Sequence, residues 1–157
     1  MSENVTRFED VEEMAGFFYN VKNTFFPELN NAKFKLIFDT KKIMSGGKLV
    51  LARIQKTNDI LRHLTRAEAQ NQEGFDYIVY LDKLMWNNIE NIDKERVIRH
   101  ELRHTLIDID SERNPYKLQP HNIEDFVEEI ELNVSDVNWR ERVATILESL
   151  YEAEKEK

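Results

Sequence analysis

Hydrophobic and polar residues alternate with two different periods along this chain, and the change of period predicts where helices give way to strands. Over residues 7–23, apolar side chains recur every three or four positions, which predicts an amphipathic helix with an aromatic stripe. Residues 33–40 and 48–55 alternate or run apolar over strand lengths, and the sequence SGG lies between them. We therefore expect two strands joined as a hairpin.

The rest of the chain adds a third strand and a second helical region. Residues 75–82, FDYIVYLD, are rich in aromatic and β-branched residues, which predicts a strand. Residues 58–74 have helical propensity but lie where a connection between strands is needed. The pattern therefore does not decide their secondary structure. A helix with a charged tail is predicted over about residues 139–153. No repeat or Pro/Ser-rich linker divides the chain, so we expect one compact α+β domain over residues 1–157, with a small twisted sheet packed against helices.

Composition narrows the chemistry that this domain can support. Of 157 residues, 41% are hydrophobic, including nine Phe, which is enough for a substantial core. Because there is no cysteine, a metal could be held only by His, Asp or Glu. The net charge of -8 disfavours a broad nucleic-acid surface. The sequence has neither a leader pattern nor a long apolar run, so we expect a cytoplasmic protein that does not engage a membrane.

The sequence RHELRHT contains the motif His-Glu-x-x-His. Asp93 can cap a helix over residues 94–108, on which His100 and His104 lie one turn apart and can bind a single ion. Glu101 lies about 100° round that helix, so it can reach a water molecule at the metal without being a ligand. A bound metal makes water more acidic, and a nearby glutamate can accept the proton. The motif therefore predicts two metal ligands and Glu101 as the catalytic residue.

Other positions of the predicted motif helix fall into two stripes. One is expected to face the core and consists of Ile98, Leu102, Thr105 and Leu106. The other is expected to face solvent and consists of Arg96, Arg99 and Arg103. His63 has no partner at metal-ligand spacing, so we expect it to be a surface or packing residue.

A catalytic zinc ion needs a third protein ligand and one open position. Downstream, Pro120 suits the first turn of a helix on which His121 projects away from the apolar stripe. Neutral imidazole suits zinc, so His121 is the expected third ligand, with Glu124 or Glu128 as alternatives. Asp125, one turn from His121, could orient an imidazole. The competing interpretation is an acidic, solvated helix face that binds no metal.

The segment WNNIENIDKERVIRHELRHT, preceded by YIVYLD and followed by HNIEDF, resembles the putative phage metallopeptidases, small zincins related in outline to SprT-like proteases. The resemblance covers residues 33–130 and implies a compact zincin fold, a zinc cofactor and a protein or peptide substrate. It implies that His100, His104 and His121 are zinc ligands and that Glu101 is the catalytic acid/base.

The resemblance also suggests where a substrate could bind. If YIVYLD is an edge strand beside the cleft, a peptide could add its backbone to the sheet there. Tyr77, Tyr80 and Trp86 would then be candidates for a pocket, although core packing is the simpler role for each.

The expected function is that of a zinc-dependent metallopeptidase of phage or prophage origin. One alternative is a zinc hydrolase for small amides, and another is a metal-stabilised, non-catalytic binding protein that engages a host protein. Glu101 argues against the binding protein, because a purely structural metal site has no use for a general base.

Overall fold

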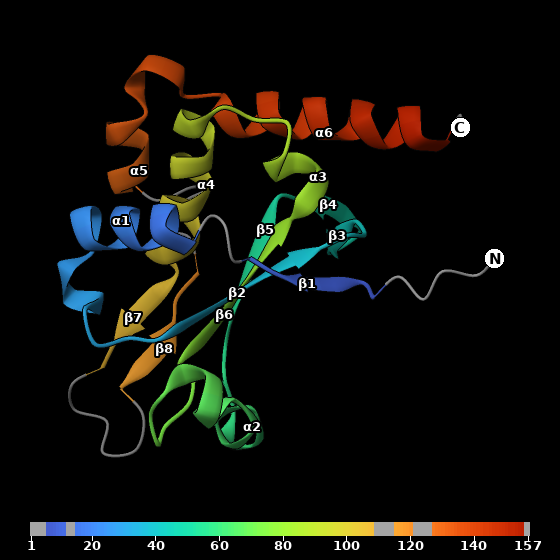
Figure 1. Cartoon of the computed structure of the whole chain (residues 1–157). Coiled ribbons are helices and arrows are strands. Elements are labelled where there is room, and N and C mark those ends of the chain that lie inside the picture. The colour runs from blue at the N-terminus through green and yellow to red at the C-terminus, as the bar shows by residue number, and fades with distance from the viewer. Residues whose placement is uncertain (1–5, 12–14, 109–114, 121–126, 156–157) are drawn as a thin grey trace.

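The computed structural model describes residues 6–11, 15–108, 115–120 and 127–155. The mixture of helices and small sheets confirms the predicted α+β class. Figure 1 shows β2 and β6 crossing the middle of the molecule, with α1, α4 and α5 gathered on one side and α6 running across one end. In chain order the elements are β1 (Phe8–Asp10), α1 (Ala15–Phe25), η1 (Pro27–Leu29), β2 (Phe34–Asp39), β3 (Ile43–Ser45), β4 (Lys48–Val50), β5 (Ala52–Lys56), α2 (Asp59–Ala69), β6 (Tyr77–Asp82), α3 (Lys83–Trp86), α4 (Asn91–Arg103), β7 (Thr105–Ile107), β8 (Tyr116–Leu118), α5 (Val127–Leu132), η2 (Val134–Asp136) and α6 (Trp139–Lys155).

The main sheet has four strands in the order β1-β2-β6-β5. β6 pairs in parallel with β2 and antiparallel with β5, so it lies between the two strands that were expected to form a hairpin. That hairpin prediction is wrong. The sequence SGG instead makes the turn of a smaller hairpin, β3–β4, in which Gly46 and Gly47 have φ values of 57° and 78°. Two consecutive positive φ values are typical of a type I′ turn, which favours glycine.

The central position of β6 also corrects its expected role as an edge strand. Tyr77, Val79 and Leu81 are completely or almost completely buried on one face, and Ile78 is buried on the other. A strand that is apolar on both faces suits the middle of a sheet covered on both sides. The edge that lies beside the motif helix α4 therefore belongs to β5, not to β6.

The N-terminal segment is only partly helical. α1 is described from Ala15, whereas Phe8–Asp10 forms β1 and pairs antiparallel with β2. The ring of Phe8 packs against Tyr80, with 5.8 Å between ring centroids. Pairing with the sheet outweighs the helical periodicity of this short segment. The predicted helix over residues 7–23 is therefore wrong at its start and correct from Ala15 onward.

Two helices, α2 and α6, lie in the segments 58–74 and 139–155. The segment left open over 58–74 contains α2, whose first turn is capped by Asn58 through a 2.8 Å hydrogen bond from the Leu61 amide. The C-terminal helix predicted over 139–153 is confirmed as α6. The core lies where α1, α4 and α6 meet the sheet, and its most buried members include Phe18, Leu36, Val79, Ile98, Leu102, Trp139, Val143 and Leu147.

Gly74, between α2 and β6, provides a test of this fold. It has a φ of +70°, and an added Cβ would meet the carbonyl oxygen of Arg62 and the hydroxyl of Thr65. We expect Gly74→Ala to lower the free energy of unfolding by roughly 2 kcal/mol, measured by urea denaturation. Gly16→Ala is the matched control, because nothing lies within 4 Å of a Cβ added there. An equal loss of unfolding free energy in both variants would contradict the positive φ and the close contacts described at Gly74.

Candidate metal centre

The helix that carries the motif begins and ends earlier than predicted. α4 runs over Asn91–Arg103 and its N-cap is Glu90, so the expected cap at Asp93 is wrong. Asp93 lies in the first helical turn, where its carboxylate accepts hydrogen bonds from Arg142 at 2.7 and 2.9 Å. His104 is the C-cap, and β7 follows it directly. Two of the four residues predicted for the core stripe, Thr105 and Leu106, therefore belong to a strand.

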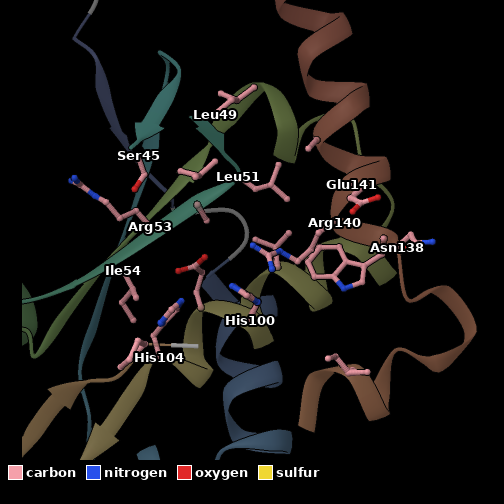
Figure 2. Close-up of a pocket in the computed structure, with 18 of the residues that line it drawn as sticks. Ser45, Leu49, Leu51, Arg53, Ile54, His100, His104, Asn138, Arg140 and Glu141 are labelled. Atoms are coloured by element: carbon pink, nitrogen blue, oxygen red, sulfur yellow. The ribbon is translucent and has the colours of Figure 1, made fainter. Parts of the chain in front are cut away.

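The two histidines of the motif lie side by side, as their spacing predicts. The ring centroids of His100 and His104 are 5.4 Å apart and the rings meet edge to face at 81°. His100 is only 5% exposed, and His104 is half-buried. Both side chains lie on the wall of the same cavity, as Figure 2 shows.

The β7–β8 hairpin fixes the orientation of His104. Its Nδ1 lies 2.8 Å from the backbone oxygen of Gln119, and the Gln119 amide donates to the His104 carbonyl at 2.6 Å. The Gln119 side chain also donates to the carbonyl of Arg103 at 2.8 Å. Since a carbonyl oxygen can only accept, Nδ1 is the donor in this contact, so Nε2 is the ring nitrogen through which His104 could bind a metal. The role of Gln119 was not predicted from the sequence, because its backbone oxygen accepts the hydrogen bond and any residue type has such an oxygen.

Glu101 is a buried acid on the same helix. It is 7% exposed, and its burial raises its pKa to about 7. The positive charge of Arg140 acts in the opposite direction and lowers the pKa of Glu101. A cation held nearby would lower it further, because an adjacent positive charge favours the carboxylate. The protein therefore keeps, beside two imidazoles, an acid that can change its protonation state near neutrality.

A cavity of about 990 Å³ opens over these three side chains. β5 and the residues before it line one side, and the first turn of α6 lines another (Figure 2). Much of the lining is apolar and consists of Leu49, Val50, Leu51, Ala52, Ile54, Val97, Leu118, Pro120, Ile130, Val137, Trp139 and Ala144. The polar lining includes Arg140 and Glu141 of α6. The cavity is therefore lined largely by apolar side chains, with polar groups supplied by α4 and by the first turn of α6.

The arginines of α4 do not form the solvated stripe that was predicted. Arg99 is 4% exposed and its Nε donates to Glu129 at 2.9 Å, while the Nε of Arg103 donates to the other oxygen of Glu129 at 3.0 Å. Arg96, which is 7% exposed, pairs with Asp93 at 3.1 Å. The prediction is wrong because α5 packs across this face of α4 and supplies the buried carboxylate of Glu129, which is 0% exposed.

The other residues singled out in the sequence have structural positions away from the two imidazoles. Tyr77 and Trp86 are buried core residues, and neither lines the 990 Å³ cavity. Tyr80 is half-buried, and the guanidinium of Arg53 lies 4.5 Å from its ring centroid. His63 is exposed on α2. Core packing therefore accounts for the first two aromatic side chains.

Comparison with known proteins assigns the chain to a family. The family model described as "putative phage metallopeptidase" matches residues 4–151. The chain belongs to this family. The match extends well beyond the segments that carry the sequence resemblance. No curated protein and no solved structure matches the chain.

The name of the phage metallopeptidase family implies a metal cofactor and a protein or peptide substrate. The expected third ligand His121, the alternative Glu124 and the supporting Asp125 lie outside the described residues. Glu128 is exposed on α5. Within the described ranges, no group of three His, Asp or Glu residues comes together as a metal site. In those same ranges no helix is long and apolar enough to cross a membrane.

The residues present fit a metal ion of the kind that the phage metallopeptidase family name implies. Two adjacent imidazoles are nitrogen donors that suit zinc, and a chain without cysteine offers no thiolate in their place. The hydrogen bond from His104 Nδ1 to a backbone carbonyl is the usual support for a metal-binding histidine. Glu101 lines the same cavity as both rings, and its buried carboxylate would be stabilised by the added positive charge.

Proposed function

We propose that this protein is a zinc-dependent metallopeptidase. The observation that carries the proposal is the edge-to-face pair His100 and His104 beside the buried Glu101, on the wall of a 990 Å³ cavity. These three groups come from α4 and its C-cap, and Gln119 makes hydrogen bonds to the His104 ring and to the Arg103 carbonyl. Family membership supports the peptidase activity, and the donor set supports zinc.

In this proposal His100, His104 and His121 hold the zinc ion, which would supply a more acidic water and a polarised peptide carbonyl. Glu101 accepts the proton of the attacking water and later returns it to the departing amine. Burial raises the pKa of Glu101 and so makes its carboxylate a stronger base than an exposed glutamate, whereas a bound cation would act in the opposite direction. The apolar cavity wall keeps other water away from the reacting groups.

We propose that the substrate binds as an extended peptide along β5. In the described part of the chain, β5 pairs with β6 along one edge and has no strand on its other edge. Leu51, Ala52 and Ile54 line the cavity, so this edge lies beside the motif helix. An extended peptide could hydrogen-bond to the edge through its backbone and place apolar side chains against the lining. β5 thus takes the role that the sequence suggested for YIVYLD.

The expected zinc content tests the ligand set. We expect about one zinc per chain by elemental analysis, and a loss of most of it in His121→Ala, because two imidazoles alone hold zinc weakly. Glu124→Ala and Glu128→Ala are the matched controls and should keep full stoichiometry. Full zinc in His121→Ala together with a loss in either control would move the third ligand to that glutamate. A fourth protein ligand in a zinc-bound crystal structure would favour the non-catalytic binding protein instead.

A further inference from the structure

The first turn of α6 holds a cationic residue, Arg140, in a fixed place relative to Glu101. Trp139, the preceding residue, is 2% exposed and belongs to the core. Arg142, two residues later, donates to both carboxylate oxygens of Asp93 at 2.7 and 2.9 Å. Asp93 and Glu101 belong to the same helix, α4. The backbone on both sides of Arg140 is therefore tied to the core or to the helix that carries the general base.

Arg140 faces the cavity, not the core. Val143 is completely buried, whereas Arg140 and Ala144, one turn apart, line the cavity. Figure 2 shows the Arg140 side chain extending from α6 toward His100. Arg140 thus places positive charge on the side of the cavity where the proposed reaction occurs.

A second cation in the same cavity is directed elsewhere. Arg53 also lines the cavity, but its guanidinium lies over the ring of Tyr80 at 4.5 Å from the centroid. In Figure 2 its side chain extends away from His100. Both arginines therefore line the cavity and carry a positive charge, but only the Arg140 side chain extends toward His100.

Peptide hydrolysis creates a need for such a charge. As the water oxygen bonds to the carbonyl carbon, one water proton passes to Glu101 and negative charge develops on the carbonyl oxygen. The C–N bond then breaks, and Glu101 returns its proton to the nitrogen, which leaves as an amine with a carboxylic acid as the other product. A cation held in place in a cavity with a largely apolar lining stabilises the developing charge more than water would.

We propose that Arg140 is a catalytic residue that binds the carbonyl oxygen of the scissile peptide and stabilises the charge that develops there. This inference rests on the proposed peptidase function. Arg140 keeps its own proton throughout, since its guanidinium acts only as a hydrogen-bond donor and a positive charge. In this proposal Glu101 transfers the proton, and Arg140 stabilises the negative charge on the carbonyl oxygen.

Steady-state kinetics of zinc-loaded variants test this role. We expect Arg140→Met to lower kcat by about a hundredfold on a peptide that the parent cleaves, with KM changed only a few-fold. Arg140→Lys should recover part of the loss because it keeps the charge. Arg66→Met is the control, because it removes the same charge from an exposed position on α2 that does not line the cavity, and it should stay within about threefold of the parent. Zinc content and the midpoint of thermal unfolding should match the parent in all three variants.

Binding of a phosphinic pseudopeptide gives a readout that does not depend on turnover. This probe carries Phe and Leu side chains and a tetrahedral, anionic phosphinate in place of the scissile amide. We expect Arg140→Met to bind it at least about tenfold more weakly than the parent does, while Arg66→Met binds it equally well. Calorimetric titration of zinc-loaded protein measures both.

The outcomes separate the two proposals. A parent that cleaves peptides while Arg140→Met keeps its kcat, or keeps its phosphinate affinity, overturns the role of Arg140 alone. Loss of zinc from Arg140→Met would also overturn it, because the residue would then support the metal site and not the oxygen. A parent that binds no zinc, or binds zinc and cleaves no peptide, overturns the peptidase function and with it the catalytic role.

Discussion

Glu101→Gln is expected to lower turnover by at least about a hundredfold while zinc content and fold stay close to those of the parent. The amide has nearly the shape of the carboxylate, so the packing around a side chain that is 7% exposed should persist. It cannot accept a proton from water at neutral pH, so the proposed reaction loses its general base. The measurement is kcat on a peptide that the parent cleaves, with zinc determined in the same samples.

The control for this substitution is Glu141→Gln. Glu141 lines the same cavity but comes from α6, and it is exposed. Removing its charge should change turnover by no more than a few-fold, which would show that the effect at Glu101 is not a general change in cavity charge. Near-parental turnover in Glu101→Gln would exclude Glu101 as the base. An equal loss in both variants would point to substrate binding instead.

Glu129→Ala is expected to lower the free energy of unfolding by about 3 kcal/mol, because it removes the buried carboxylate that the buried Arg99 and the half-buried Arg103 share. Arg99 is 4% exposed and lies 5.0 Å from the ring centroid of Phe25, and Arg103 lies 4.5 Å from that of Phe26. Once Glu129 is gone, the buried Arg99 keeps, among the residues that the structure describes, only the ion pair with Glu95 at 3.1 Å, whereas Arg103, whose side chain is 22% exposed, is already partly in contact with water. Urea denaturation monitored by circular dichroism measures the loss.

Glu128→Ala is the control for this stability effect, since Glu128 precedes Glu129 and is exposed. It should change the free energy of unfolding by no more than about 0.5 kcal/mol. Glu129→Gln keeps the shape and one hydrogen-bond acceptor, so it should lose less than the alanine variant. Equal stability of Glu129→Ala and Glu128→Ala would mean that the ion pairs between α4 and α5 do not hold the two helices together.

The placement of the two histidines was predictable because it depends on local geometry alone. Residues four apart on a helix face the same way, and the ring centroids of His100 and His104 lie 5.4 Å apart as a result. The end of the helix was not predictable in the same way. The chain leaves α4 at His104 because β7 pairs with β8, a contact that depends on residues more than ten positions later.

The errors in the sheet and in the arginine stripe have a common physical cause. Strand pairing and helix packing join residues that are distant in the sequence, and periodicity carries no information about partners. The nearly continuous apolar run of YIVYLD suits a central strand, but it does not say that the two partners are β2 and β5. Likewise, an arginine at a helix surface has the same pattern whether it faces water or a buried carboxylate such as Glu129. Local elements were predictable, and their partners were not.

The central position of β6 has a consequence for how the chain can fold as it is synthesised. β2 and β5 both precede β6 in the chain, yet each takes β6 as a neighbour, and Phe34 pairs with Tyr77. Until residues 77–82 have left the ribosome, these two strands therefore lack their shared partner and expose backbone that can pair with other chains. The motif helix follows only nine residues after β6 ends, at Asn91. The helix that carries the site can therefore dock onto the sheet almost as soon as the last strand is in place.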